Sequence, residues 1–145
     1  MVGDAHQPLH VSVRLNAAGK WDKLGNGLTV NNPFNLQKPK TTLHAFWDDL
    51  PGPSSLRGVQ LDAVTRVLLS TIPHPPRAIS SDQWIEESWR IANESAYPQG
   101  NDALPTIRSE FYENSQKIAF QRISEAGCRL GDLLNDLLRT RKVPE

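Results

Sequence analysis

The sequence predicts a mainly α-helical domain. Apolar side chains recur at helical spacing over residues 55–72 and again over residues 117–139. Ser80, followed three residues later by Gln83, is the capping-box pattern that starts a helix. The chain has 145 residues, of which 38% are hydrophobic and 22% charged, so its composition is that of one globular domain rather than a disordered chain. No apolar run approaches the roughly 20 residues that span a membrane.

The first half of the chain combines short helices with a long irregular connection. Residues 1–9 are predicted to form the last turns of a helix that is ended by a proline. Residues 19–40 are rich in Gly, Asn and Pro and are predicted to be irregular, with a β-like run at 28–30. Residues 41–50 are predicted to form a short helix, stopped by the Pro-Gly-Pro that follows.

The second half is predicted to be helical throughout, apart from its connections. A helix over residues 55–72 ends at a proline-rich segment, and the helix that begins at Ser80 runs to about residue 96. Residues 102–116 form the next predicted helix, with Pro105 in its first turn. Residues 117–139 form the last one. Its apolar stripe consists of Ile118, Ile123, Ala126, Leu130, Leu133, Leu134 and Leu137.

The charge balance limits the kinds of ligand that the chain can bind by itself. Sixteen Lys and Arg side chains are cancelled by sixteen Asp and Glu side chains. A protein that binds nucleic acid through a broad basic face normally has a clear excess of positive charge. If this chain acts on a phosphate group, a bound metal ion is the obvious source of the missing positive charge. The lone Cys128 excludes an internal disulfide framework.

Two clusters of ligand-type residues stand out. The first lies at the start of the chain and includes Asp4 and His10; the second contains His44 and Asp48. On a helix, residues four apart lie on one face, with Cβ atoms about 5–6 Å apart. An imidazole and a carboxylate so placed can bind one zinc ion, and His10 would supply a third ligand. The same spacing also occurs in hydrogen-bonded surface pairs, so the spacing alone leaves both interpretations open.

Other conspicuous residues have structural explanations. His6 is predicted to be a hydrogen-bonded helix residue rather than a ligand. Trp47, Trp84 and Trp89 are predicted to be core residues, whereas Trp21, in the irregular connection, could be core or could stack on a base. The neighbouring Glu86 and Glu87 are predicted to combine one solvated charge with one inward hydrogen bond. His74 lies between prolines and is predicted to be solvated.

The residue sequences of the two clusters, and their order in the chain, resemble the motifs of a known family. Residues 3–10 read GDAHQPLH and residues 43–48 read LHAFWD, which is similar to the signature of the zinc-dependent S1/P1 single-strand nucleases. Weaker matches follow the chain order, with GN at 25–26, WIEES at 84–88 and AGCRL at 126–130. The resemblance implies the mainly helical, multi-helix fold that this family shares with zinc phospholipase C.

The resemblance also implies a site and an activity. The family holds three zinc ions in one cleft. His10, His44 and Asp48 match the protein ligands of one ion, and Asp4 matches a catalytic carboxylate that bridges the other two. The remaining ligands belong to a part of the family's domain that lies before residue 1, so residues 1–145 match the carboxy-terminal part of a single zinc nuclease domain. That missing amino-terminal segment is therefore an expected partner, and no membrane contact is expected.

The implied reaction is hydrolysis of single-stranded DNA and RNA and of 3′-nucleotides to 5′-phosphorylated products, in a secreted or periplasmic enzyme. The chain by itself is expected to be inactive. Three departures from the family pattern bear on substrate preference. Thr42 stands where an Asn is common, Gly27 stands where an Asp is common, and Asp49 occupies a position that contacts the nucleotide in some relatives.

Three other interpretations remain open at this point. A lipid hydrolase similar to phospholipase C would use the same kind of zinc cluster, although the wording of both motifs favours a nuclease. A truncated, non-catalytic remnant would hold one zinc ion at most. An unrelated helical interaction module would carry these His and Asp residues as surface polar groups.

Overall fold

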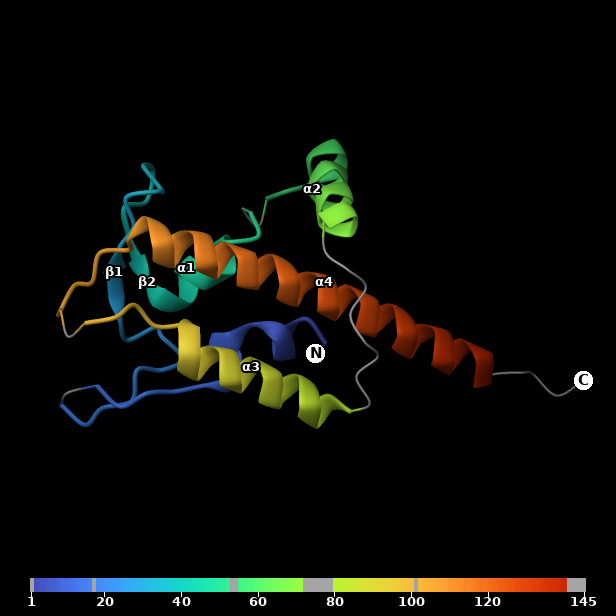
Figure 1. Cartoon of the computed structure of the whole chain (residues 1–145), viewed down its shortest axis with the longest axis horizontal. Helices are drawn as coiled ribbons and strands as arrows, with labels where there is room; N and C mark the ends of the chain where they lie inside the picture. Colours follow the sequence, from blue (N-terminus) through green and yellow to red (C-terminus); the bar gives the residue numbers. More distant parts are fainter. Residues whose placement is uncertain (1, 17, 53–54, 72–79, 101, 141–145) are drawn as a thin grey trace, which may run out of the picture.

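The longest element of the computed structural model is α4, Ser109–Thr140, along which the other elements are arranged (Figure 1). The structure describes residues 2–16, 18–52, 55–71, 80–100 and 102–140. In chain order the elements before α4 are the 3₁₀ turns η1 (Asp4–His6) and η2 (Pro8–Val11), strands β1 (Thr29–Asn31) and β2 (Lys40–Thr42), and helices α1 (Leu43–Asp49), α2 (Gly58–Thr71) and α3 (Ser81–Ser95). The prediction of a mainly α-helical fold is confirmed.

The amino-terminal segment lies between α3 and α4 (Figure 1) and forms two 3₁₀ turns rather than the end of an α-helix. The predicted helix is therefore wrong here. Pro8 does not end a helix but occupies the first position of η2, where its missing N–H costs nothing. The side-chain oxygen of Gln7 caps the same turn by accepting the backbone N–H of Leu9.

A small hairpin leads into α1. Strands β1 and β2 are antiparallel, with Val30 opposite Thr41, and the β-like run predicted at 28–30 overlaps β1. The Thr42 hydroxyl accepts the N–H of Ala45 at 3.2 Å and caps α1. This places α1 within the predicted range of 41–50. The helix over 55–72 is also confirmed as α2, Gly58–Thr71.

The capping box that starts α3 is present, since Ser80 and Gln83 bond reciprocally. The two helices predicted over 102–116 and 117–139 are wrong, because α4 is a single helix that starts at Ser109. Pro105 precedes it in extended backbone. The Pro105 carbonyl accepts the N–H of Asn31 at 2.8 Å, and the N–H of Ile107 donates to Asn31 O at 2.9 Å. This pairing with β1 holds residues 105–107 out of the helix.

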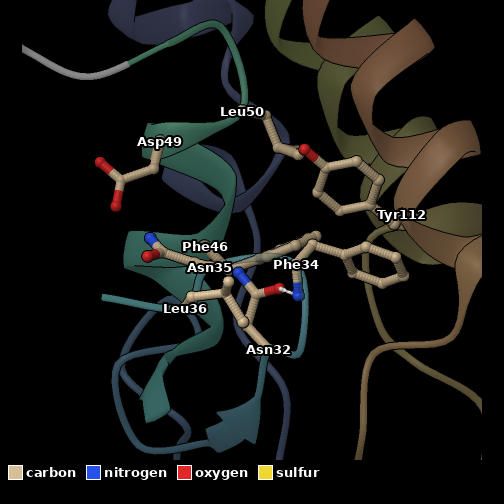
Figure 2. Close-up of a pocket in the computed structure, with 8 residues that line it drawn as sticks. All are labelled: Asn32, Phe34, Asn35, Leu36, Phe46, Asp49, Leu50 and Tyr112. Atoms are coloured by element: carbon tan, nitrogen blue, oxygen red, sulfur yellow. Dashed lines mark hydrogen bonds between the residues drawn. The ribbon is translucent and has the colours of Figure 1, made fainter. Parts of the chain in front are cut away.

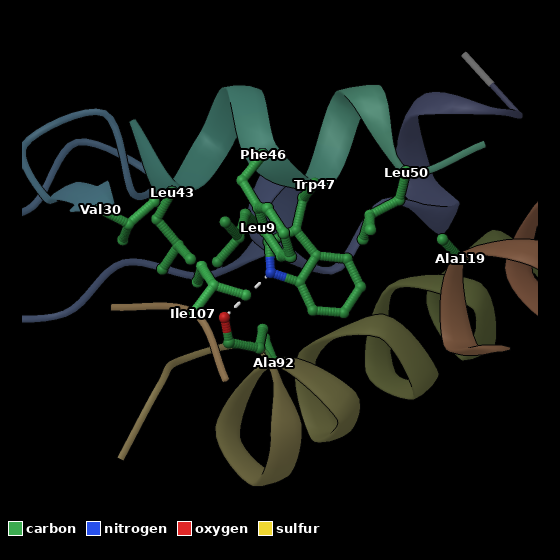
Figure 3. Packing of buried hydrophobic residues seen from close by; sticks show 10 residues of the cluster. Leu9, Val30, Leu43, Phe46, Trp47, Leu50, Ala92, Ile107 and Ala119 are labelled. Atoms are coloured by element: carbon green, nitrogen blue, oxygen red, sulfur yellow. Dashed lines mark hydrogen bonds between the residues drawn. The ribbon is translucent and has the colours of Figure 1, made fainter. Parts of the chain in front are cut away.

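The core joins α1, the amino-terminal segment and α3 (Figure 3). Its members are Leu9, Val30, Leu43, Phe46, Trp47, Leu50, Ala92, Ala96, Ile107 and Ala119. The indole N–H of Trp47 donates to Ala96 O at 2.9 Å, so this buried ring is satisfied. Trp47 is a core residue as predicted, and Trp84 is half-buried, whereas Trp89 is 54% exposed and was wrongly assigned to the core. The inward positions of α3 are taken by Ser88 and Ala92.

Exposed apolar side chains follow α4 from its middle to its end. They are Ile123, Leu130, Leu133, Leu134, Leu137 and Leu138. The apolar stripe predicted from the sequence therefore exists, but the described residues bury only part of it. In the described part of the chain, no helix is long and apolar enough to cross a membrane. His74 lies outside the described residues.

Candidate metal centre

The structure brings together His10 from η2 and His44 and Asp48 from α1. One ligand atom of each lies within 4.8 Å of the other two. His10 Nε2 is 3.6 Å from Asp48 Oδ1, and His44 Nε2 is 3.4 Å from Asp48 Oδ2. The two imidazole rings are stacked with centroids 5.0 Å apart. The helical spacing of His44 and Asp48 places both on the face of α1 that meets η2, and the core contacts of Leu43 and Trp47 hold that face in position.

Hydrogen bonds fix which nitrogen of each histidine is available. Nδ1 of His10 lies 2.8 Å from Asp4 Oδ1, and Nδ1 of His44 lies 2.8 Å from the carbonyl oxygen of Leu24. Both partners are acceptors, so Nδ1 of each ring is the donor and Nε2 is the nitrogen left to bind a metal ion. Metal-binding histidines typically donate their other nitrogen to a carboxylate or a carbonyl in this way. Asp4 therefore orients His10 in this structure.

The turn that presents the Leu24 carbonyl requires a glycine. Leu24 has a φ of 61° and Gly25 a φ of 82°, both in the left-handed region. A Cβ on Gly25 would lie 2.9 Å from Leu9 Cδ1 and 3.2 Å from the backbone nitrogen of His44. The Gly-Asn pair singled out in the sequence thus allows the connection to approach α1 closely beside His44.

Asp48 is also held by a neighbour. The Gln7 side-chain amide donates to Asp48 Oδ1 at 3.0 Å, which links the first sequence cluster to the second. Zinc binds imidazole nitrogen and carboxylate oxygen at about 2.0–2.2 Å, so tetrahedral ligand atoms stand roughly 3.3–3.6 Å apart. The spacings of 3.6 Å to Asp48 Oδ1 and 3.4 Å to Asp48 Oδ2 are of this size. Two imidazoles and one carboxylate also leave a fourth position open, as in catalytic zinc sites. The residues present fit a zinc ion.

A cavity of about 280 Å³ adjoins these ligands. Asp4, His10 and Asp48 line one part of it, and Trp47 and Ile123 contribute apolar wall. Three of the four residues that the sequence suggested as metal ligands thus line one cavity, and the fourth, His44, lies beside Asp48. The bridging role of Asp4 remains a prediction.

Asp49 lines a different cavity, of about 360 Å³, which Figure 2 shows beside α1. The rings of Phe34 and Tyr112 lie at one edge of this cavity, stacked with centroids 4.4 Å apart, and Asp49 lies at the opposite edge. Asn32 and Asn35 also line it. Phe34 and Tyr112 could not be selected from the sequence, because no local pattern connects a loop residue with one in α4.

A buried charged cluster supports the first ligand segment. Glu87 bonds both Arg122 and Arg129, and Arg122 also bonds Glu125. Partial burial by itself raises the pKa of the Glu87 carboxyl, but the hydrogen bonds from the two arginines outweigh it and hold this pKa below its usual value. Burial lowers the pKa of His6, and the two arginine charges lower it further, despite the bond to the Val2 carbonyl. His6 is accordingly neutral at neutral pH.

The expectation that His6 is structural agrees with this geometry, since it is buried and bonded at both nitrogens. Glu86 pairs with Arg90 at the surface while Glu87 points inward, as predicted. The sequence analysis noted the segment 126–130 but assigned no role to Arg129 or to Arg122. Both lie in an amphipathic helix, where an arginine normally indicates a solvated face.

The helical fold and the His/Asp cluster beside a cavity are typical of metal-dependent hydrolases. The sequence profile of the family described as S1/P1 Nuclease matches residues 1–139. The chain therefore belongs to the S1/P1 nuclease family, a family of nuclease-type hydrolases. No match was found among curated proteins.

Proposed function

We propose that this chain contributes one zinc site to a phosphodiesterase that cleaves single-stranded DNA or RNA and 3′-nucleotides and leaves 5′-phosphorylated products. The convergence of His10, His44 and Asp48 is the observation that carries the proposal. Membership of the nuclease family supports a nucleic acid as the substrate. The same membership supports a secreted or periplasmic location.

Each residue has a distinct part in the proposed site. His10, His44 and Asp48 hold the zinc ion, which when bound supplies the positive charge that attracts phosphoryl oxygens and that the neutral chain itself lacks. Asp4 accepts a hydrogen bond from His10 Nδ1 and so keeps Nε2 of His10 directed at the ion. Gln7 orients the Asp48 carboxylate in the same way. By family resemblance, Asp4 is also the carboxylate that binds the remaining two ions.

The chain alone is proposed to be catalytically incomplete. Among the residues that the structure describes, one group of three ligand-type side chains is close enough to hold an ion. Among the described residues, Asp4 is the one that the family resemblance assigns to the other two ions. An additional segment that supplies their ligands would complete the site.

The proposal predicts how the purified chain behaves with denatured DNA and zinc. The chain by itself should show no turnover above that of the His44→Ala variant, because only one of three ions is held. Turnover should appear when the amino-terminal segment of an S1/P1 nuclease is added, and it should be lost again with His44→Ala or with a chelator. Lecithin serves as the comparison substrate.

Two results would contradict parts of this proposal. Turnover by the chain alone at the level of a complete family nuclease would show that it is not incomplete. Preferential hydrolysis of lecithin by the complemented protein would favour a lipid hydrolase instead of a nuclease.

The cavity beside Asp49 is proposed to bind a base of the single strand. The exposed ring of Phe34 offers a stacking surface, and the Asp49 carboxylate can accept hydrogen bonds from base amino groups. Because Asp48 and Asp49 are consecutive, a base in this cavity belongs to a nucleotide close to the metal centre.

Phe34→Ala should weaken binding of a fluorescent single-stranded oligonucleotide to the zinc-loaded chain by roughly 5- to 150-fold, since base stacking contributes about 1–3 kcal/mol per base. Trp21→Ala is the matched control, because Trp21 is an exposed aromatic residue outside this cavity. Fluorescence anisotropy measures both. If Trp21→Ala weakens binding and Phe34→Ala does not, Trp21 is the stacking platform and the proposed cavity is not.

A further inference from the structure

The buried cluster between α3, α4 and the amino-terminal segment contacts the stretch of chain that joins Asp4 to His10. We propose that Arg129 and Arg122 are positioning residues that set the geometry of Asp4 and His10 for metal binding. This inference rests on the metal site proposed above, and it concerns two residues that touch none of the proposed ligands through a hydrogen bond in the described part of the structure.

Arg129 bonds the ring of His6. Its Nη1 lies 2.7 Å from His6 Nε2 and 2.7 Å from Glu87 Oε2, and its Nη2 donates to Glu87 Oε1 at 3.0 Å. The side chain is 5% exposed. Its Nε is buried and has no partner among the described residues, so the guanidinium acts through its two terminal nitrogens. These contacts join His6 to α3 and α4 at once.

Arg122 and Ser88 hold the backbone of the same stretch. Arg122 Nε donates to the carbonyl oxygen of His6 at 3.3 Å and its Nη2 donates to Ser88 Oγ at 2.8 Å. Ser88 Oγ in turn donates to the carbonyl oxygen of Ala5 at 2.6 Å. Two successive carbonyls between Asp4 and His10 are thus satisfied by side chains from distant helices.

The segment needs this support because it forms few hydrogen bonds of its own. Turn η1 is held by His6 N–H to Gly3 O at 3.1 Å and by Gln7 N–H to Asp4 O at 3.3 Å. Short 3₁₀ turns have poorer hydrogen-bond geometry than α-helices. Asp4 and His10 stand at either end of the supported stretch and bond each other at 2.8 Å. A shift of His6 would therefore be transmitted to the ligand pair.

The positive and negative charges of the buried cluster are balanced, which is compatible with a metal cation nearby. Arg122 lines the same cavity as Asp4 and His10, and an unbalanced arginine there would repel a zinc ion. Glu87 and Glu125 balance the two arginines, and the His6 ring is held at both nitrogens by Val2 O and Arg129 Nη1. The cluster can therefore brace the metal centre without opposing the charge of the ion.

Arg129→Gln tests the inference on the full chain with zinc as the probe. We expect zinc affinity, measured by calorimetry or by competition with a cobalt absorption band, to fall about 10- to 100-fold, as for other residues that support metal ligands. Amide hydrogen exchange across residues 3–10 should accelerate in the metal-free variant. Arg129→Lys keeps the charge but loses the paired bonds to Glu87, so it should recover only part of the affinity.

Two controls separate positioning from general destabilisation. Phe111→Ala removes a ring that stacks on Phe46, which lines the Asp49 cavity and not the one beside the metal centre, and should lower the Tm at least as much, yet leave zinc affinity within about twofold at temperatures where the chain is folded. Arg139→Gln makes the same charge change near the exposed end of α4 and should have no effect on affinity.

The outcomes distinguish this inference from the proposed function. If the unsubstituted chain binds zinc and folded Arg129→Gln binds it equally tightly, the positioning role is overturned and the metal site stands. Equal losses of affinity in Phe111→Ala and Arg129→Gln would likewise overturn it. If the unsubstituted chain binds no zinc, the metal site and this inference both fail.

Discussion

Asp48→Asn should lower the zinc affinity of this chain by at least about 100-fold, beyond the range seen when only a supporting residue is lost. The substitution replaces the one anionic ligand of the triad by a neutral amide, whose carbonyl oxygen is a weaker donor to zinc. The two imidazoles alone would leave the ion with two protein ligands. Zinc titration followed by calorimetry measures the change.

Asp49→Asn is the matched control for this experiment. It makes the same change in charge and shape one residue further along the chain, on a side chain that lines the other cavity. Its zinc affinity should fall far less than that of Asp48→Asn, since Asp49 is exposed and is not one of the three residues whose ligand atoms converge. Equal losses for Asp48→Asn and Asp49→Asn would mean that zinc binds through bulk negative charge and not at the triad.

Arg122→Met should destabilise the fold by about 3–5 kcal/mol, because it leaves the buried Glu125 carboxylate without its cation, whereas Glu87 keeps Arg129. Arg122 is 4% exposed and bonds Glu87, Glu125 and the carbonyl oxygens of His6 and Trp84. Methionine can fill much of the space but can donate to none of these acceptors. Urea unfolding followed by circular dichroism gives the difference in free energy.

Arg90→Met is the control for the unfolding measurement, because it removes an arginine from an exposed ion pair. Arg90 pairs with Glu86 at 3.2 Å, but both side chains are mostly exposed. Such surface pairs contribute about 0–1 kcal/mol, so this substitution should barely move the unfolding midpoint. A free energy of unfolding for Arg122→Met within about 1 kcal/mol of that of the unsubstituted chain would show that the buried cluster contributes little to stability.

The sequence determined the features that depend on neighbouring residues, such as helix faces and helix caps. The spacing of His44 and Asp48 placed both on one face of a short helix, and Thr42 caps that helix where the pattern begins. Ser80 and Gln83 form the predicted capping box. Helical periodicity of the apolar residues was enough to predict the mainly α-helical fold class. The two motifs together pointed to the family, to the converging residues His10, His44 and Asp48, and to Asp4, which bonds His10.

Tertiary contacts decided the rest. His6 and Arg129 are 123 positions apart, and Phe34 stacks on Tyr112 of another element; no periodicity in the chain connects either pair. Backbone pairing of Ile107 with Asn31 kept the residues before Ser109 extended, where the sequence predicted a helix that began earlier. A local pattern reports which conformations a segment favours. Which partner satisfies its polar groups depends on chain segments that meet only when the molecule folds.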